Sequence, residues 1–202
     1  MISTEIEQQL WGEGFNRVMG LDEVGRGCLA GPVVAAGVIL RPGTTIIGVQ
    51  DSKKLSEKER VELAEIIKSE SLFWTVKEGS LEEIERLNIL WASLHTMQKC
   101  VEESGADPDY LLVDGNRYTT SLIPYTCVVK GDDKSVSIGA ASILAKVYRD
   151  ELMKKLDKEF PEFGWKKNVG YPTPVHKKAL IEHGYTKYHR MGFNLGTQKN
   201  YK

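Results

Sequence analysis

Residues 17–40 read RVMGLDEVGRGCLAGPVVAAGVIL. Residues 17–22 and 33–40 are short apolar runs, and a glycine-rich turn joins them. Such runs are typical of buried strands, and the turn between them favours pairing as a hairpin. The stretch therefore predicts two neighbouring strands, with the acidic pair Asp22-Glu23 at the end of the first.

Outward from this hairpin, two capping boxes mark the starts of helices at positions 56–59 (SEKE) and 80–83 (SLEE). The first helix is expected to end near Ser69, and the second near Gly105. Apolar residues at helical spacing predict the buried face of each helix. These residues are Val61, Ala64 and Ile67 in the first helix, and Ile84, Leu87, Trp91, Leu94 and Val101 in the second.

Further strands are expected over 72–78, 110–114 and 122–130, with a long helix over 135–156 and a short one over 175–183. This order predicts an α/β fold, in which helices cover a mixed sheet and a small helical tail follows. A chain of 202 residues suits one domain or a core with an appendage. We expect a core over 1–160 and a helical C-terminal lobe over 161–202.

Composition excludes some classes of protein and leaves others open. The net charge is −1, so a nucleic-acid partner would need a local basic patch. Lysines and arginines crowd the chain after Lys146, and they are either a solvated surface or a cationic lobe that faces phosphates.

The three cysteines lack disulfide or zinc spacing. The N-terminus is polar, and no apolar run approaches the ~18 residues that span a bilayer, so we expect a cytoplasmic protein.

Acidic residues follow three of the predicted strands: Asp22-Glu23, Asp114 and Asp132. Strand ends can converge in space, and clustered carboxylates repel one another unless a cation neutralises them. Hard oxygen ligands favour Mg²⁺ or Mn²⁺ over zinc. A single aspartate after a strand is also a common turn former, so each position alone has this second interpretation. The adjacent pair is harder to explain in that way, because burying two unpaired carboxylates is costly.

Gly25-Arg26-Gly27 follows the acidic pair. Exposed backbone amides beside an arginine suit an anionic oxygen or a sugar hydroxyl, although a flexible hairpin loop would explain the glycines equally well.

Together these residues resemble type 2 ribonuclease H (ribonuclease HII). The resemblance begins with residues 20–36 (GLDEVGRGCLAGPVVAA) and 51–56 (DSKKLS). It continues through 113–115 (VDG), 129–132 (VKGD), 140–147 (AASILAKV) and 149–150 (RD). It ends with 170–173 (GYPT), His176 and 189–193 (HRMGF). These segments occur in order over nearly the whole chain, which makes the resemblance specific.

The resemblance implies a ribonuclease H-like fold: a five-stranded mixed sheet whose first three strands are antiparallel, with helices on both sides. It implies that four carboxylates bind two Mg²⁺ or Mn²⁺ ions: Asp22, Glu23, Asp114 and Asp132. Gly25, Arg26 and Gly27 would read the ribose 2′-hydroxyl, which distinguishes RNA from DNA. Tyr171 would pack on the following sugar. Lys53, Ser142 and Lys146 would contact phosphates.

Other residues receive weaker roles. Asp150 is expected to be a helix-surface residue or to support the site from outside the metal ligands, rather than to bind metal directly. His176 and His189 are expected to have structural or phosphate-side roles. Core packing is the expectation for Trp91.

The implied activity is endonucleolytic cleavage of RNA in RNA/DNA hybrids and 5′ to single ribonucleotides in duplex DNA, leaving 3′-hydroxyl and 5′-phosphate ends. We expect a monomer without a sliding-clamp-binding motif in its tail. Three alternatives stay open: a type 3 enzyme that needs several ribonucleotides, a non-catalytic hybrid-binding module, and an enzyme of small phosphate esters. The type 3 relatives carry an extra N-terminal domain that we do not find in this sequence.

Overall fold

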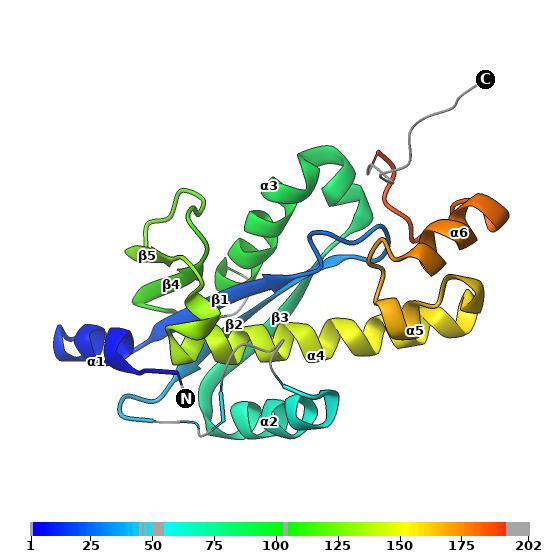
Figure 1. Cartoon of the computed structure of the whole chain (residues 1–202). Coiled ribbons are helices and arrows are strands. Elements are labelled where there is room, and N and C mark those ends of the chain that lie inside the picture. Colours follow the sequence, from blue (N-terminus) through cyan, green and yellow to red (C-terminus); the bar gives the residue numbers. More distant parts are fainter. Residues whose placement is uncertain (1, 45, 47, 50–54, 103–104, 193–202) are drawn as a thin grey trace.

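The computed structural model describes residues 2–44, 46, 48–49, 55–102 and 105–192. Its helices and strands follow in chain order (Figure 1). They are α1 (Glu5–Gly12), β1 (Val18–Val24), β2 (Val33–Leu40), α2 (Glu57–Glu70), β3 (Ser71–Gly79), α3 (Leu81–Glu102), β4 (Tyr110–Asp114), β5 (Tyr125–Val128), η2 (Gly131–Asp133), α4 (Val136–Glu159), η3 (Pro161–Phe163), α5 (Trp165–Asn168) and α6 (Pro174–His183).

The strands form one sheet in the order β3-β2-β1-β4-β5. β2 pairs antiparallel with both β1 and β3, whereas β4 pairs parallel with β1 and β5. The expected five-stranded mixed sheet with three antiparallel strands is therefore confirmed. β1 lies at its centre and carries Asp22 and Glu23 at its C-terminal end.

Helices cover both faces of the sheet (Figure 1). All eight residues of β2 are buried, and because side chains alternate along a strand, they divide between two cores. Val34 and Val38 pack with helices α2 and α4. Ala35 and Ile39 pack on the opposite face with Met97 of α3. A strand buried on both faces accounts for the continuous apolar run that predicted it.

α4 approaches the sheet closely at Gly20. A Cβ added to Gly20 would lie 2.2 Å from the carbonyl carbon of Ser137, so only glycine fits at this point of β1. The close approach places α4 over the strand that carries Asp22.

Helix α1 was not expected from the sequence. Its Glu7 is fully buried, and Oε1 accepts hydrogen bonds from Ser135 Oγ (2.5 Å), Ser137 N (3.0 Å) and Ser137 Oγ (2.7 Å). A carboxylate at the N-terminus of α4 stabilises the positive end of that helix.

Both predicted capping boxes are present: Glu59 N donates to Ser56 Oγ, and Glu83 N donates to Ser80 Oγ. In α2 the buried face consists of Leu63, Ala64 and Ile67, so the prediction that Val61 faces inward was wrong.

Two other predictions were wrong in detail. Trp91 is 51% exposed, because α3 is interrupted at Asn88 (φ 62°). The helix restarts there with Asn88 Oδ1 accepting hydrogen bonds from Leu90 N and Trp91 N, and this break defeats a continuous helical periodicity. β5 begins at Tyr125 rather than residue 122, where Leu122 is fully exposed.

The residues after α4 form a small apolar cluster. Phe163, Trp165 and Leu180 pack with Met153 of α4 and with Leu29 from the β1–β2 loop. The C-terminal segment therefore rests on that loop, while the division at residue 160 stays a prediction. None of the helices in the described part of the chain is long and apolar enough to cross a membrane.

Candidate active site

Strand register brings two of the predicted carboxylates together. The parallel pairing of β1 with β4 aligns Leu21 with Val113, so Asp22 and Asp114 follow as neighbours at adjacent strand ends. Leu21 and Val113 pack on the α3 side of the sheet, and alternation directs the next residue of each strand toward α4. The sequence could not show this pairing, since it depends on how the strands align.

Asp22 lies in an electrostatically unfavourable position. It is 6% exposed, and Oδ1 accepts a hydrogen bond from Glu23 N at 2.7 Å. Burial, followed by the nearby charges of Glu23 and Asp114, raises the pKa of Asp22 well above its usual value. The hydrogen bond from the Ser142 side chain opposes this shift. A cation bound between these carboxylates would relieve the repulsion.

Asp132 lies in the short helix η2, which is hydrogen-bonded to the side chain of Asp114. Gly131 N donates to Asp114 Oδ1 at 2.7 Å. A Cβ on Gly131 would lie 3.2 Å from that oxygen and 2.6 Å from Ile138 Cδ1, so glycine permits the approach. Asp132, which follows Gly131, is therefore held near the ends of β1 and β4.

These four acids supply only oxygen ligands, which fit Mg²⁺ or Mn²⁺. In the part of the chain that the structure describes, no three acidic, histidine or cysteine side chains are already close enough together to hold a metal ion. Metal binding by Asp22, Glu23, Asp114 and Asp132 accordingly stays a prediction.

A cavity of about 210 Å³ opens beside Glu23 and Asp114. Arg26 lies at its edge, and its Nη1 is 3.4 Å from Glu23 Oε1. Two exposed residues that the sequence analysis did not single out, Asn116 and Arg117, also line this cavity. Their position directly after the Val-Asp-Gly motif is the signal that could have identified them.

Buried Arg149 supports the loop that carries Gly25-Arg26-Gly27. Its guanidinium donates to the carbonyl oxygens of Pro32 (3.0 Å), Val169 (2.8 Å) and Ala30 (3.0 Å). Gly25 has φ 95°, and a Cβ there would lie 2.2 Å from Arg149 Nε. Glycine at this position thus allows both the turn and the close packing of the arginine.

Arg190 holds the same loop from the C-terminal side. Its Nη1 donates to Arg26 O (3.1 Å), and its Nε donates to Gly31 O (2.9 Å). Tyr171 completes the arrangement, because a Cβ on Gly27 would meet Tyr171 Cε1 at 3.6 Å. The structure therefore brings the predicted ribose-reading loop and Tyr171 together.

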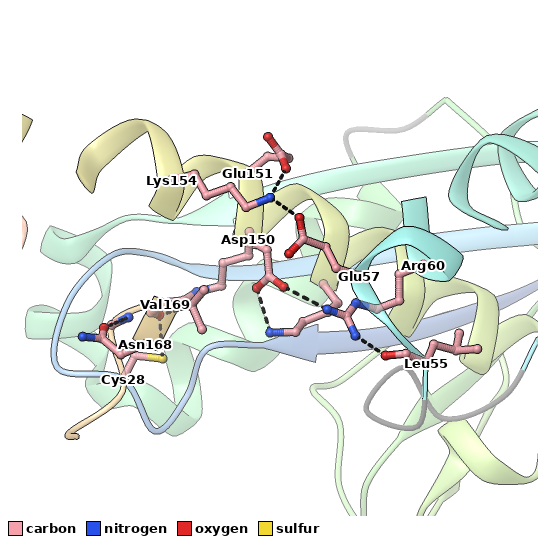
Figure 2. A network of polar contacts seen from close by, with 12 residues as sticks. Cys28, Leu55, Glu57, Arg60, Asp150, Glu151, Lys154, Asn168 and Val169 are labelled. Atoms are coloured by element: carbon pink, nitrogen blue, oxygen red, sulfur yellow. Dashed lines mark hydrogen bonds and ion pairs between the residues drawn. The ribbon is translucent and has the colours of Figure 1, made fainter. Parts of the chain in front are cut away.

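Lys146 belongs to a polar network between α4 and α2 (Figure 2). Its Nζ lies 2.7 Å from Asp150 Oδ1, and Asp150 Oδ2 lies 3.6 Å from Arg60 Nη2. Arg60 Nη1 donates in turn to Leu55 O at 2.6 Å. Asp150 therefore orients Lys146, while Lys53 lies outside the described residues.

The C-terminal lysines are partly neutralised. Lys154 pairs with Glu57 and Glu151, both at 2.6 Å (Figure 2), and Lys187 pairs with Glu159 at 2.9 Å. These two lysines form ion pairs, and the choice between a solvated surface and a lobe that faces phosphates stays open.

Comparison with known proteins places this geometry in a family. The family model described as Ribonuclease HII matches residues 19–195. The chain belongs to the ribonuclease HII family. The Ribonuclease HII of Salinibacter ruber is 49% identical over 193 residues, covering 94% of this chain and 96% of that protein.

Two solved structures share the fold of this family member. The ribonuclease H2 of Pyrococcus horikoshii matches with a TM-score of 0.78 and 25% identity, over 89% of this chain and 94% of that one. The ribonuclease HII of Archaeoglobus fulgidus, solved in complex with PCNA, matches with a TM-score of 0.72 and 27% identity. The match covers 91% of this chain and 98% of that one. The chain is thus a ribonuclease H endonuclease, a metal-dependent hydrolase of RNA, with the ribonuclease H-like fold.

Proposed function

We propose that this ribonuclease HII cuts the phosphodiester 5′ to a single ribonucleotide embedded in duplex DNA, and cuts the RNA strand of longer hybrids, leaving 3′-hydroxyl and 5′-phosphate ends. One observation carries the proposal. The β1–β2 loop follows directly on Asp22 and Glu23, and Tyr171 lies beside it at Gly27. A group that recognises ribose and a ring that can pack on the next sugar therefore flank the same acidic cluster.

Separate groups of residues would bind the metal ions, the ribose and the following sugar. Asp22, Glu23, Asp114 and Asp132 would hold two divalent ions, which when bound activate a water molecule and stabilise the leaving oxygen. Backbone amides of Gly25 to Gly27 would bind the 2′-hydroxyl. Arg26 and Gly27 are exposed, whereas buried Gly25 supplies the turn beside Arg149. Tyr171, 39% exposed, would pack on the deoxyribose that follows.

Two residues of α4 would position the phosphate. Lys146, held by Asp150, would contribute positive charge. Ser142 would contact a phosphate, as the sequence predicts. Its side chain also donates a hydrogen bond to the Asp22 carboxylate, and this bond couples the orientation of the carboxylate to α4.

The test is cleavage of a DNA duplex that carries one ribonucleotide, with Mg²⁺, Mn²⁺ or EDTA, beside an RNA/DNA hybrid and an all-DNA duplex. We expect a single cut 5′ to the ribonucleotide that EDTA abolishes, and an intact all-DNA duplex. Cleavage of the hybrid but not of the single ribonucleotide would overturn the proposal in favour of a type 3 activity.

Arg26→Ala tests the ribose-reading loop. The variant should lose discrimination between ribonucleotide-containing and all-DNA duplexes more than it loses affinity for duplex. Arg41→Ala is the matched control, because this exposed arginine follows the far end of β2 and does not line the cavity. Unchanged discrimination in Arg26→Ala would contradict the role of this loop.

The proposed partner is nucleic acid, bound by a monomer that contains no sliding-clamp motif. Adding a sliding clamp should therefore leave the cleavage rate unchanged, and sedimentation should give the mass of one chain. A clamp-dependent rate or a stable dimer would contradict these expectations.

A further inference from the structure

Two buried histidines in the C-terminal lobe take no part in the proposed chemistry. His176 and His189 are 0% and 4% exposed, and their Nε2 atoms lie 3.1 Å apart. Trp165 Nε1 lies 3.1 Å from His176 Nε2, and the ring of Phe163 packs against both imidazoles. The sequence marked both histidines only through the resemblance to a family.

The partners of these rings define where the protons lie. An indole N–H can only donate, so His176 Nε2 accepts from Trp165. The proton of neutral His176 is then on Nδ1, which donates to Tyr171 O at 3.0 Å. His189 Nδ1 accepts from Thr186 N at 2.9 Å, which leaves its proton on Nε2 to donate to His176.

Each ring must be neutral for this chain of hydrogen bonds to form. A second proton on His176 would face the indole N–H and the N–H of His189. Burial agrees with this arrangement, since it lowers the pKa of His176 and lowers the pKa of His189 to about 4. The two histidines thus form a fixed link rather than a proton-transfer pair.

One end of this link holds the segment that carries Tyr171. His176 binds the carbonyl oxygen of Tyr171, and the preceding residue, Gly170, accepts a hydrogen bond from Leu29 N at 2.7 Å. The Tyr171 ring faces Gly27.

The other end of the link is also attached to this loop. His189 forms an antiparallel bridge with Ala30, and Arg190 N donates to Leu29 O at 2.8 Å. The two segments that bind the β1–β2 loop at Leu29 are therefore joined to each other through the imidazole pair.

We infer that His176 and His189 are positioning residues that hold Tyr171 in register with Gly25-Arg26-Gly27, and so determine how well the enzyme recognises a junction from ribonucleotide to deoxyribonucleotide. This inference rests on the proposed function, in which Tyr171 packs on the deoxyribose. The link acts on orientation, so it should affect turnover at a single ribonucleotide more than substrate affinity.

Two substitutions of His176 separate its two hydrogen bonds. His176→Asn places an amide N–H near the position of Nδ1 and so retains a donor for Tyr171 O. His176→Gln places an oxygen near the position of Nε2 and so retains only the acceptor for Trp165 and His189. His183→Gln is the matched control, since His183 is an exposed histidine of the same helix, α6.

The readout is the ratio of cleavage rates on a duplex with one ribonucleotide and on an RNA/DNA hybrid, with kcat and KM measured for each. His176→Gln should lower kcat on the single-ribonucleotide duplex by roughly 10-fold, with KM nearly unchanged, because misplaced contacts reduce turnover. His176→Asn should stay closer to the unmodified enzyme, and His183→Gln should equal it. An unchanged ratio in folded His176→Gln would overturn the inference.

A Tyr171→Ala background separates positioning from a general loss of structure. If His176 acts through Tyr171, His176→Gln should not lower the ratio further in that background. An equal additional loss there would refute the inference. If Tyr171→Ala alone leaves the ratio unchanged, the proposed role of Tyr171 fails, and the inference fails with it.

Thermal unfolding verifies that each variant is folded at the assay temperature. If His176→Gln does not fold, His189→Asn provides the test, since its side-chain oxygen can still accept from Thr186 N while the donor to His176 is lost. A lower ratio in His189→Asn would support the inference, and an unchanged ratio would overturn it.

Discussion

Replacing Asp22 with asparagine should stabilise the metal-free protein while removing its activity. Asp22 is buried beside Asp114 and Glu23, and both neighbours raise its pKa. Asparagine keeps an oxygen that can accept the hydrogen bond from Glu23 N. The substitution therefore removes a repelled charge and leaves the local geometry in place.

The expected gain follows from Coulomb's law. At about 5 Å, a usual separation for paired side chains on neighbouring strands, and an effective dielectric constant of about 20, two full charges repel by about 3 kcal/mol. Protonation of Asp22 relieves part of this repulsion, so the net gain should be about 1–2 kcal/mol at pH 8. For a chain of this size, that gain corresponds to a rise in Tm of roughly 2–8 °C.

The sign of the pH dependence is fixed by the raised pKa of Asp22. Between the unfolded pKa of about 3.9 and the higher folded pKa, the native protein binds more protons than the unfolded chain. The contribution of Asp22 to stability therefore falls as pH rises through this interval. The advantage of Asp22→Asn should grow from pH 5 to pH 8.

Urea unfolding in EDTA at these two pH values measures the effect, with cleavage of a single-ribonucleotide duplex as the parallel assay. Saturating Mg²⁺ should reduce the difference in stability, since a metal ion stabilises the state that it binds. The reasoning is refuted if Asp22→Asn is less stable than the unmodified protein in EDTA at pH 8, or if it retains full activity.

Three further outcomes test the fold around the site. Gly20→Ala should lower the free energy of unfolding by about 3 kcal/mol, because its Cβ meets backbone atoms of Ser137. Gly12→Ala, with nothing within 4 Å, should have little effect, and equal urea midpoints for the two variants would contradict this account. Arg149→Lys should cost about 3 kcal/mol through lost hydrogen bonds to buried carbonyls. An unchanged urea midpoint would show that the guanidinium is dispensable. Because burial lowers the pKa of His189 to about 4, the contribution of His189 to stability should fall as pH drops from about 6.5 toward 4, by up to about 1.4 kcal/mol per pH unit. His189→Asn should flatten this dependence in urea titrations at pH 7 and pH 5, and an equal slope in both proteins would exclude His189 as its source.

The three central strands of the sheet were predictable because they are mostly buried and uninterrupted. The run over 33–40 matches β2 in full, and 110–114 matches β4, since both consist mainly of apolar residues. α1 was missed although residues 4–7 (TEIE) have the spacing of a capping box. In the structure Thr4 makes no side-chain capping bond, and Glu7 bonds to Ser135 and Ser137 instead. The position of α1 depends on Glu7, whose partners are more than a hundred residues away.

The site was predictable only in part, because it also depends on contacts between residues that are distant in the sequence. Residue type identified the carboxylates, but the proximity of Asp22 to Asp114 follows from the register of β1 and β4. The hydrogen bond between Ser142 and Asp22 depends on how α4 lies across β1. The tautomers of His176 and His189 depend on Trp165 and Thr186, which no local pattern joins to them.

The central position of β1 has a consequence for synthesis of the protein. The hairpin partner of β1 follows within residues 33–40, whereas its parallel partner β4 spans 110–114. Chains emerge from the ribosome N-terminus first, and local pairings form before distant ones. Until β4 emerges, one side of β1 is an open edge that can recruit other strands. Asp22 and Asp114 stay apart during the same interval, so the event that closes this edge also brings these two carboxylates together.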